Sequence, residues 1–212
     1  MGEPRAFAKG VQGAALMTET SFERVFIDGT AELLPNFTLE KLMYDNFEKI
    51  GVVQHNDEER AFAAELRKTF PPQSAVPGIG AHFNADIAET VMEKTHDLTE
   101  PLNDFLMPYY SGTGFTAGST DVGDVSWLTP AAQIETATWP SGMPLHTWQT
   151  VACGKSSIAY KGMLCAGKVM AASAIDLIED PELLKAAREE FKRRAKGGYT
   201  CPIEPETVPT AL

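Results

Sequence analysis

The most informative segment of the chain is GSTDVGDVSWLTPAAQIETATWPSGMPLHTWQTVACGKSSIAYKGM, residues 118–163. It opens as a loop rich in glycine, hydroxyl and carboxylate groups, where backbone N–H groups can approach a ligand closely. The alternation in QIETATW, residues 133–139, predicts a strand, and a proline-flanked loop that carries His146 follows it. A long helix is expected from about Ser156 to Ile178. The segment therefore predicts a ligand-binding site.

Capping signals predict three further helices around this segment. Thr38 is a plausible N-cap for a helix whose apolar residues fall at helical spacing up to a stop at Gly51. Asn56, with a glutamate three residues later, forms a capping box that starts a second helix, ended by a Pro-Pro pair at residues 71–72. Asp180 caps a third helix, with proline in its first turn and glycines at its end, residues 197–198.

The N-terminal residues and the middle of the chain are predicted from weaker patterns. Residues 6–17 resemble a helix with small side chains on its packed face, and residues 22–28 alternate as a strand before an Asp-Gly turn. Between residues 73 and 118 the sequence is rich in Pro, Gly and Asn, and we expect a strand near Ala81 and a helix from about Ile87 to Lys94.

Composition narrows the class of protein. With 212 residues, 43% hydrophobic and 22% charged, the chain is globular, and ~150 residues per domain would give about 1.4 domains. Its formal net charge of −11 has the wrong sign for binding nucleic acid or an anionic membrane. Between Thr69 and Gly154, Lys94 is the only basic residue against nine acidic ones. That stretch either holds a cation or is a solvated acidic face.

The cysteines and the N-terminal residues indicate a protein of the cytoplasm. Cys153, Cys165 and Cys201 lack CxxC spacing, so neither a disulfide framework nor a zinc knuckle is expected. The start MGEPRAFAKG has no apolar signal core, and the longest apolar run, residues 163–178, contains two charges. We therefore expect a soluble protein of a reducing, cytoplasmic compartment.

Few residues offer chemistry by themselves. His146 follows a predicted strand, where a metal ligand or general base is common, but a lone histidine is more often structural. Asp121 and Asp124 suit a helix N-terminus as well as a carboxylate that orients a metal ligand. His55 and Asp57 copy the His-x-Asp pair of two-metal hydrolases, although helix capping explains this turn more simply. Cys153 has no nearby base in the sequence, so it is a weak nucleophile candidate.

Residues 118–163 closely resemble the C-terminal part of the aminobenzoyl-glutamate utilization protein B-like amidohydrolases, in the amidohydrolase branch of metallopeptidase family 20. Upstream, GAALMTET (residues 13–20), ELLPN (residues 32–36) and a helix that ends in KIG resemble the same family. The fold implied is α/β: the C-terminal half of a zinc-peptidase-like α/β/α catalytic domain, residues 37–212, preceded by the last helix and strand of an α+β lid and dimerisation domain, residues 1–36.

The resemblance also implies roles for individual residues. His146 matches the last metal ligand of the family, and the GSTD segment matches the loop that lines the substrate pocket. Asn36 matches an asparagine at the return from the lid, which would face the pocket. The predicted substrate-binding residues are thus Gly118, Ser119, Thr120, Asp121 and Asn36. His55, His82 and His96 do not fall on ligand positions of the family.

The same resemblance implies that much of the active site lies outside this chain. The first metal-binding segment, the bridging acidic ligand and the glutamate general base belong to an N-terminal half that the chain does not contain, so we expect no catalytic residue here. A complete enzyme would use one or two divalent metals, zinc or manganese, to generate a hydroxide that cleaves an N-acyl amino acid such as p-aminobenzoyl-glutamate. It would form a homodimer. The chain alone is expected to be inactive and to bind no stoichiometric metal.

Two other interpretations remain open at this stage. The chain could be a non-catalytic binding or assembly module that retains an acidic substrate pocket. It could also be a self-contained hydrolase that uses His55, His82 and His146 as a new metal site, in which case the purified chain would bind metal. An uncovered lid fragment further predicts self-association or dependence on a partner.

Overall fold

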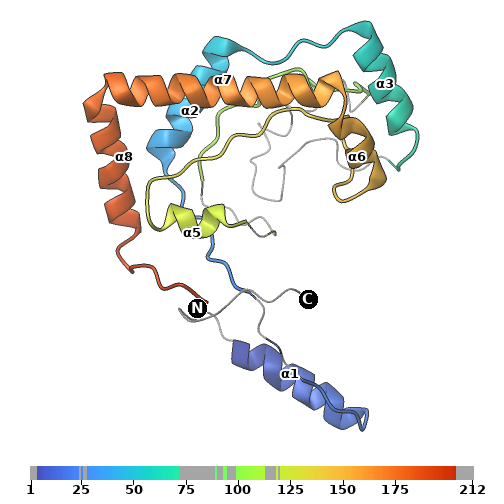
Figure 1. Ribbon diagram of the computed structural model, residues 1–212, viewed down its shortest axis with the longest axis vertical. Coiled ribbons are helices and arrows are strands. Elements are labelled where there is room, and N and C mark those ends of the chain that lie inside the picture. The colour runs from blue at the N-terminus through green and yellow to red at the C-terminus, as the bar shows by residue number, and fades with distance from the viewer. Residues whose placement is uncertain are drawn as a thin grey trace. The chain divides into compact units, whose positions relative to one another are not determined.

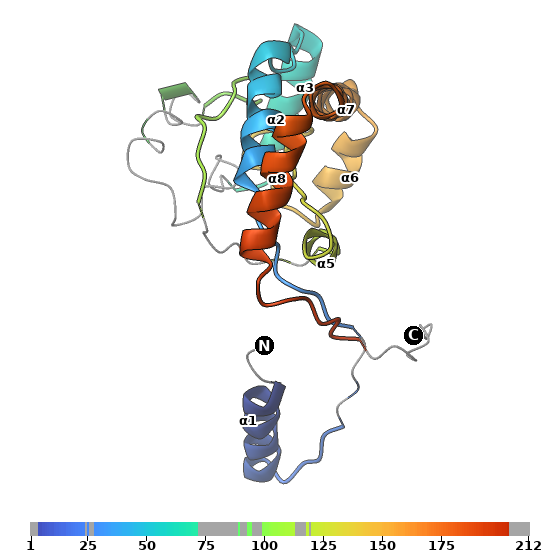
Figure 2. The same ribbon diagram turned by 90° about the vertical axis from the view of Figure 1, so that its left-hand side faces the viewer.

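The computed structural model describes residues 4–23, 25, 28–71, 89, 93–94, 99–112, 118 and 120–203, and the side chains from residue 8 onward. The chain divides into two compact units. Unit 1 comprises residues 1–29 and 201–212, and contains α1 (Pro4–Met17). Unit 2 comprises residues 30–200 and contains all the other described helices (Figures 1 and 2). The predicted helix at residues 6–17 is thus confirmed, two residues longer at its start.

Unit 2 is built around the long helix α7 (Ser157–Glu179). This helix contacts α2 (Phe37–Ile50), α6 (Trp148–Gly154) and α8 (Pro181–Arg194). In Figure 1, α2 passes behind α7, and α8 turns down from the C-terminal end of α7. The helix α3 (Asp57–Arg67) and the short helix α5 (Val122–Ser126) complete the described elements.

The predicted caps are confirmed at two of the three helices for which a cap was predicted. Asn56 and Glu59 form the capping box of α3, and the Asp180 side chain accepts two backbone N–H bonds at the start of α8. Ser156, where the long helix was expected to begin, caps α7. The cap of α2 was predicted wrongly. Asn36, not Thr38, accepts the N–H of Leu39, at 3.1 Å, because an asparagine two positions earlier can fill the same role.

The helix ends are set largely by local chain conformation. Gly51 ends α2 with φ 80°, a left-handed conformation that glycine adopts without strain, as the sequence predicts. The helix α3 ends at Arg67 rather than at the Pro-Pro pair, because residues 68–70 already form a turn. Likewise α8 ends at Arg194, before the predicted glycine stop.

No strand occurs in the described residues. Residues 133–139 are all described and have no regular secondary structure, so the strand predicted there is absent from this structure. Residues 24, 26 and 27 of the other predicted strand, and the strand near Ala81, lie outside the described residues. The helix expected at residues 87–94 is described only at residues 89, 93 and 94, which are helical. The α/β class therefore stays a prediction.

The core of unit 2 lies where α3, α6 and the start of α7 meet the loops at residues 101–103 and 139–143. Its buried members are Ala63, Leu66, Phe70, Leu102, Met143, Cys153 and Ile158, with Trp139 packed against them. Glycine at position 162 lets α7 approach the carbonyl of Ala137, since a Cβ there would lie 2.4 Å from that oxygen. Within the described residues, no helix is long and apolar enough to span a lipid bilayer.

Candidate functional site

His146 lies on an exposed loop that leads into α6. Its backbone has φ 57°, the left-handed conformation that non-glycine residues adopt uncommonly and that recurs at functional sites. The hydroxyls of Thr147 and Thr150 both donate to the carbonyl of Pro144, at 3.0 and 3.2 Å, and so close the loop around the histidine. The imidazole makes no hydrogen bond or ion pair with another described residue. It is therefore available to a ligand.

The two ends of this loop are fixed to the core. Before the loop, Ser141 donates its backbone N–H to the carbonyl of Pro101 at 2.9 Å, and its side chain is hydrogen-bonded to Asn103 at 2.9 Å. After the loop, Gln149 is buried and donates to the carbonyl of Thr69 at 3.3 Å. Hydrogen bonds to other parts of unit 2 thus hold both ends of the loop that carries His146.

The predicted substrate loop precedes α5. Gly118, Thr120 and Asp121 are exposed, whereas Ser119 lies outside the described residues. The Thr120 hydroxyl accepts the N–H of Val122 at 3.3 Å. Asp121 occupies the N-cap position of α5 but makes no capping bond, so its carboxylate faces solvent. In Figures 1 and 2, α5 and α6 lie on the same side of α7, but no described contact joins the substrate loop to His146.

The other carboxylate of this segment, Asp124, anchors α5 to the chain that enters and leaves unit 2. It accepts the backbone N–H of Ala31 at 3.3 Å and the hydroxyl of Tyr199. Leu34 donates its N–H to Ser126 at 2.8 Å, and the Trp127 indole donates to the carbonyl of Glu32 at 2.8 Å. Asp124 lies in the first turn of α5, as the helix-terminus alternative predicts, but neither alternative predicts its hydrogen bonds to Ala31 and Tyr199.

Asn36 also has a structural place. It is 2% exposed, and its amide donates to the carbonyl of Ala187 in α8 at 2.9 Å while its oxygen caps α2. These bonds join the two helices. A contact between Asn36 and substrate stays a prediction that no described contact supports.

His55 does not pair with Asp57 as a His-x-Asp metal pair would require. Its side chain is fully buried, and its Nδ1 lies 3.5 Å from Glu59, with neither ring nitrogen hydrogen-bonded. Burial lowers the pKa of His55, so the ring is neutral. His82 and His96 lie outside the described residues. In the part of the chain that the structure describes, no three His, Cys, Asp or Glu side chains come together as a metal site.

Two buried carboxylates, Glu59 and Glu190, form polar clusters, and the sequence predicts only some of their hydrogen bonds. Glu59 accepts bonds from Lys161 at 2.7 Å and Ser157 at 2.6 Å, besides its capping bond to Asn56. Burial raises the pKa of Glu59, but these donors and the Lys161 charge outweigh it and lower the pKa to about 2. The capping box predicts the bond to Asn56, whereas no local signal predicts the partners from α7.

Glu190 of α8 binds the start of α2 in the same way. It accepts the backbone N–H groups of Phe37 and Thr38 at 3.0 and 2.9 Å, the Thr38 hydroxyl at 2.7 Å, and Arg194 Nε at 2.8 Å. Burial raises the pKa of Glu190, but these four donors lower it to about 2. Both clusters hold helices together, and neither reaches the His146 loop.

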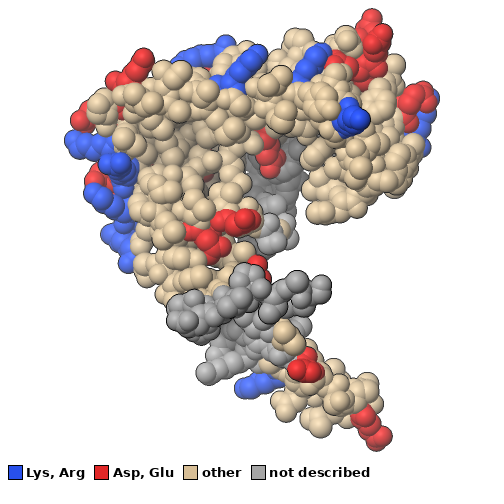
Figure 3. Space-filling view, viewed as in Figure 1, with Lys and Arg blue, Asp and Glu red and all other residues tan. Residues whose placement is uncertain are grey.

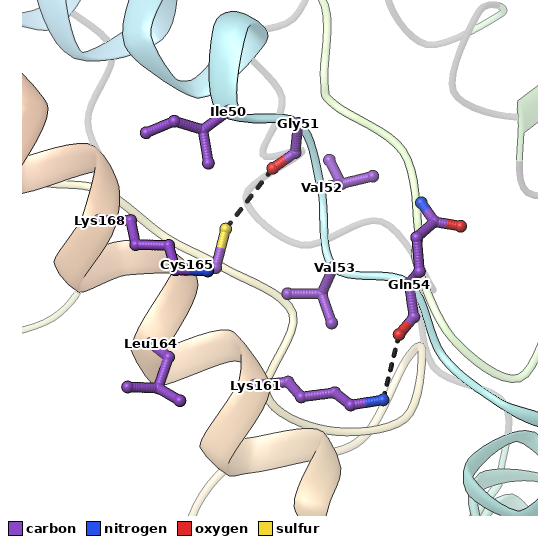
Figure 4. A pocket seen from close by; sticks show the side chains of 9 residues that line it. All are labelled: Ile50, Gly51, Val52, Val53, Gln54, Lys161, Leu164, Cys165 and Lys168. Carbon is purple, nitrogen blue, oxygen red and sulfur yellow. Dashed lines mark hydrogen bonds between the residues drawn. The ribbon is translucent and has the colours of Figure 1, made fainter.

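A groove of about 280 Å³ lies between residues 50–54 and α7 (Figure 4). Lys161 donates to the carbonyl of Gln54 at 3.2 Å, and the Cys165 thiol donates to that of Gly51 at 3.7 Å. Burial raises the pKa of Cys165, which keeps the thiol protonated. The residues that line this groove include no carboxylate and no imidazole, so it offers no acid–base pair for hydrolysis.

Comparison with known proteins gives an informative match. No family model and no solved structure matches the chain. Over 209 residues, 97% of its length, the chain is 39% identical to one of the subunits of p-aminobenzoyl-glutamate hydrolase from Escherichia coli (strain K12), and it spans 43% of the length of that protein. The resemblance predicted from residues 118–163 is thereby confirmed, and the chain is a relative of this p-aminobenzoyl-glutamate hydrolase subunit.

Proposed function

We propose that the chain is the C-terminal portion of a metal-dependent amidohydrolase that cleaves the amide bond of N-acyl amino acids such as p-aminobenzoyl-glutamate. The observation that supports this most is the 39% identity to a p-aminobenzoyl-glutamate hydrolase subunit across 97% of the chain. The match includes the segment that carries His146 and most of the predicted substrate loop, because it spans nearly the whole chain.

The described residues do not form a metal site by themselves. His146 is exposed and makes no hydrogen bond or ion pair within the described residues, which is compatible with a metal ligand. No second or third ligand lies beside it among those residues. A catalytic zinc needs three protein ligands and an open position. We infer that His146 supplies one ligand and that the others, with the general base, come from outside this chain.

The predicted substrate loop has one group that can bind a substrate carboxylate and one that would repel it. The exposed Thr120 hydroxyl can donate to a substrate carboxylate while it accepts the N–H of Val122. Asp121 would repel the same carboxylate, so we assign it to the wall of the pocket rather than to direct binding. The acyl and amino-acid specificity would then depend on groups outside the described residues as well.

The relative's name calls it a subunit, and we propose that this chain too works in an assembly. The partners would be the remaining part of the hydrolase and, in the complete enzyme, a second copy. We place the protein in the cytoplasm, because its two buried cysteines are free thiols that a reducing compartment would preserve.

The test is to express the chain together with the part of the Escherichia coli subunit that lies outside the matched 209 residues. The matched segment of that subunit, expressed in the same arrangement, is the control. The assembled protein is incubated with Zn²⁺ or Mn²⁺ and p-aminobenzoyl-glutamate, and p-aminobenzoate is measured. We expect release that a chelator abolishes.

A purified assembly that takes up metal and leaves the amide intact would contradict the proposal if the control assembly is active. Tight binding of p-aminobenzoyl-glutamate without turnover would instead support the non-catalytic module. If the isolated chain binds less than a stoichiometric amount of metal, the self-contained hydrolase is ruled out. Stoichiometric metal on the isolated chain would contradict the proposed split of ligands.

A further inference from the structure

The helix α7 is apolar on two opposite faces. One face is buried against α2, α8 and the loop at residues 136–138, and it includes Ile158, Cys165 and Val169. The opposite face is exposed. Its large side chains, which we call the second α7 face, are Tyr160, Met163, Leu164, Met170, Ile175 and Ile178. Met163 is 61% exposed and Ile178 80%, so little of the chain covers them.

The second α7 face carries no charge. Residues 157–179 contain four charged side chains, and at 100° per residue Lys161, Lys168 and Glu179 fall within about 20° of one another, in a narrow stripe between the two faces. Asp176 lies on the buried side, where it accepts a bond from Asn46 at 2.7 Å. Figure 3 shows the front of the upper part of the molecule, where α7 lies, mostly tan, with basic atoms along its upper edge and acidic atoms at its left end.

A helix that is apolar all round is normally buried on all sides. Five turns of exposed Met, Leu, Ile and Tyr therefore indicate an interface rather than a solvent-facing surface. The exposed face of α8 is different, because it has basic and acidic residues paired at i and i+3, such as Lys185 with Glu182.

The size of the relative indicates what covers this face. The matched 209 residues are 43% of the Escherichia coli subunit, so more than half of that protein has to pack against this segment or beside it. A second copy of this chain is a poorer occupant, because two copies would bring together formal charges of −11 each, −22 in all.

We propose that the second α7 face is the docking surface for the remaining part of the hydrolase, through an uncharged apolar surface on that part. This inference rests on the proposed function, because it assumes that the part of the hydrolase that docks on α7 also supplies the metal ligands that this chain lacks. Since α6 packs against α7 and begins two residues after His146, docking on α7 also fixes where His146 lies relative to the partner's ligands.

The test places a charge on the face in the co-expressed assembly. Met163→Glu and Ile175→Glu are the variants, and Lys168→Glu, on the charged stripe of the same helix, is the control that changes net charge by more. Circular dichroism of each purified chain establishes that it is folded. Sedimentation measures the complex with the unmatched part of the Escherichia coli subunit, the probe used here.

We expect a one-to-one complex with the wild-type chain and with Lys168→Glu, and at least a 30-fold weaker complex with each face variant. A complex that both face variants retain at full strength would overturn the proposal. So would a wild-type chain that forms a homodimer through this face and no complex, because the occupant would then be a second copy. A wild-type chain that stays monomeric and forms neither the homodimer nor the complex would also overturn the proposal.

The docking surface and the proposed function can fail separately. If the assembly depends on the second α7 face but does not hydrolyse p-aminobenzoyl-glutamate, the proposed docking surface stands and the proposed function is wrong. If the assembly is active and tolerates Met163→Glu and Ile175→Glu, the proposed function stands and the proposed docking surface is wrong.

Discussion

Glu190 is the residue that most directly joins two distant parts of the chain. It lies in α8, yet its carboxylate accepts the first two N–H groups of α2, which have no partner inside their own helix. A carboxylate at a helix N-terminus also interacts favourably with the helix dipole. One buried side chain therefore satisfies a helix end, neutralises Arg194 and fixes the angle between α2 and α8.

Glu190→Gln should destabilise unit 2. The amide keeps the shape of the side chain, but its NH2 group cannot accept the two hydrogen bonds that one carboxylate oxygen accepts, and the other two bonds lose the charge that strengthens them. Hydrogen bonds to charged groups contribute a net ~1.5–3 kcal/mol each. We expect the free energy of unfolding, from urea titration, to fall by about 2 kcal/mol. Glu189→Gln is the matched control, since the neighbouring carboxylate is exposed and bonds only Lys192, and it should leave the unfolding midpoint unchanged. Equal midpoints for the two variants would contradict this role.

Acid should destabilise the protein in two stages. A buried neutral His55 has a lowered pKa, so the unfolded chain takes up a proton first and stability falls as the pH drops through about 6.5. Glu59 and Glu190 have pKa values lowered to about 2, so their contribution is complete above about pH 4.5 and is lost as the pH falls towards 2. Urea midpoints measured from pH 7 to pH 3 should show both stages, and Glu190→Gln should flatten the second. An unchanged second stage in that variant would refute the assignment.

At the scale of the elements, the correct predictions concern helix ends that depend only on residues close together in the sequence. The capping box of α3, the glycine that ends α2 and the Asp-Pro start of α8 are each encoded within four residues, and all three are present. The cap of α2 was misplaced by two residues because Asn36 and Thr38 are both good caps, and the choice depends on Ala187 and Glu190 of α8. Such long-range partners leave no trace in a single sequence.

The same limit applies to the predicted strand and to the site. Alternation over residues 133–139 indicates a strand, but a strand exists only with a neighbour to pair with, and none is present among the described residues. His146 was found through its proline-flanked loop and the family resemblance, and the structure adds its left-handed backbone. The position of the further ligands that we propose cannot be predicted from this sequence, because the proposal places them outside it.

The packing of α7 on the loop at residue 137 gives a test at this scale. Gly162→Ala would place a Cβ 2.4 Å from the Ala137 carbonyl oxygen, so the helix or the loop has to move, at a cost of ~1–3 kcal/mol. Gly167→Ala on the same helix meets nothing within 4 Å and should stabilise the chain by up to about 1 kcal/mol through helix propensity. Thermal unfolding of the two variants should therefore shift in opposite directions. A shift in the same direction would show that α7 does not pack as described.

At the scale of the whole molecule, the described part of the chain has an exposed histidine, His146, and an exposed apolar face on α7. The length of the chain, about 1.4 times that of a typical domain, is compatible with a chain that spans 43% of the length of its relative. Its polar clusters at Glu59 and Glu190 hold helices together, and its only predicted metal ligand has no described companion. The account thus depends on His146 completing a site whose other ligands come from elsewhere.

Metal content and hydrolysis of the assembled protein with His146→Ala test this most directly. Leu145→Ala, at the exposed neighbouring position, is the matched control, and sedimentation first establishes that both variants assemble. We predict that the wild-type and Leu145→Ala assemblies bind metal and cleave p-aminobenzoyl-glutamate. The His146→Ala assembly should lose at least 100-fold in activity and part of its bound metal. An assembled His146→Ala protein with full metal content and undiminished hydrolysis would contradict the account.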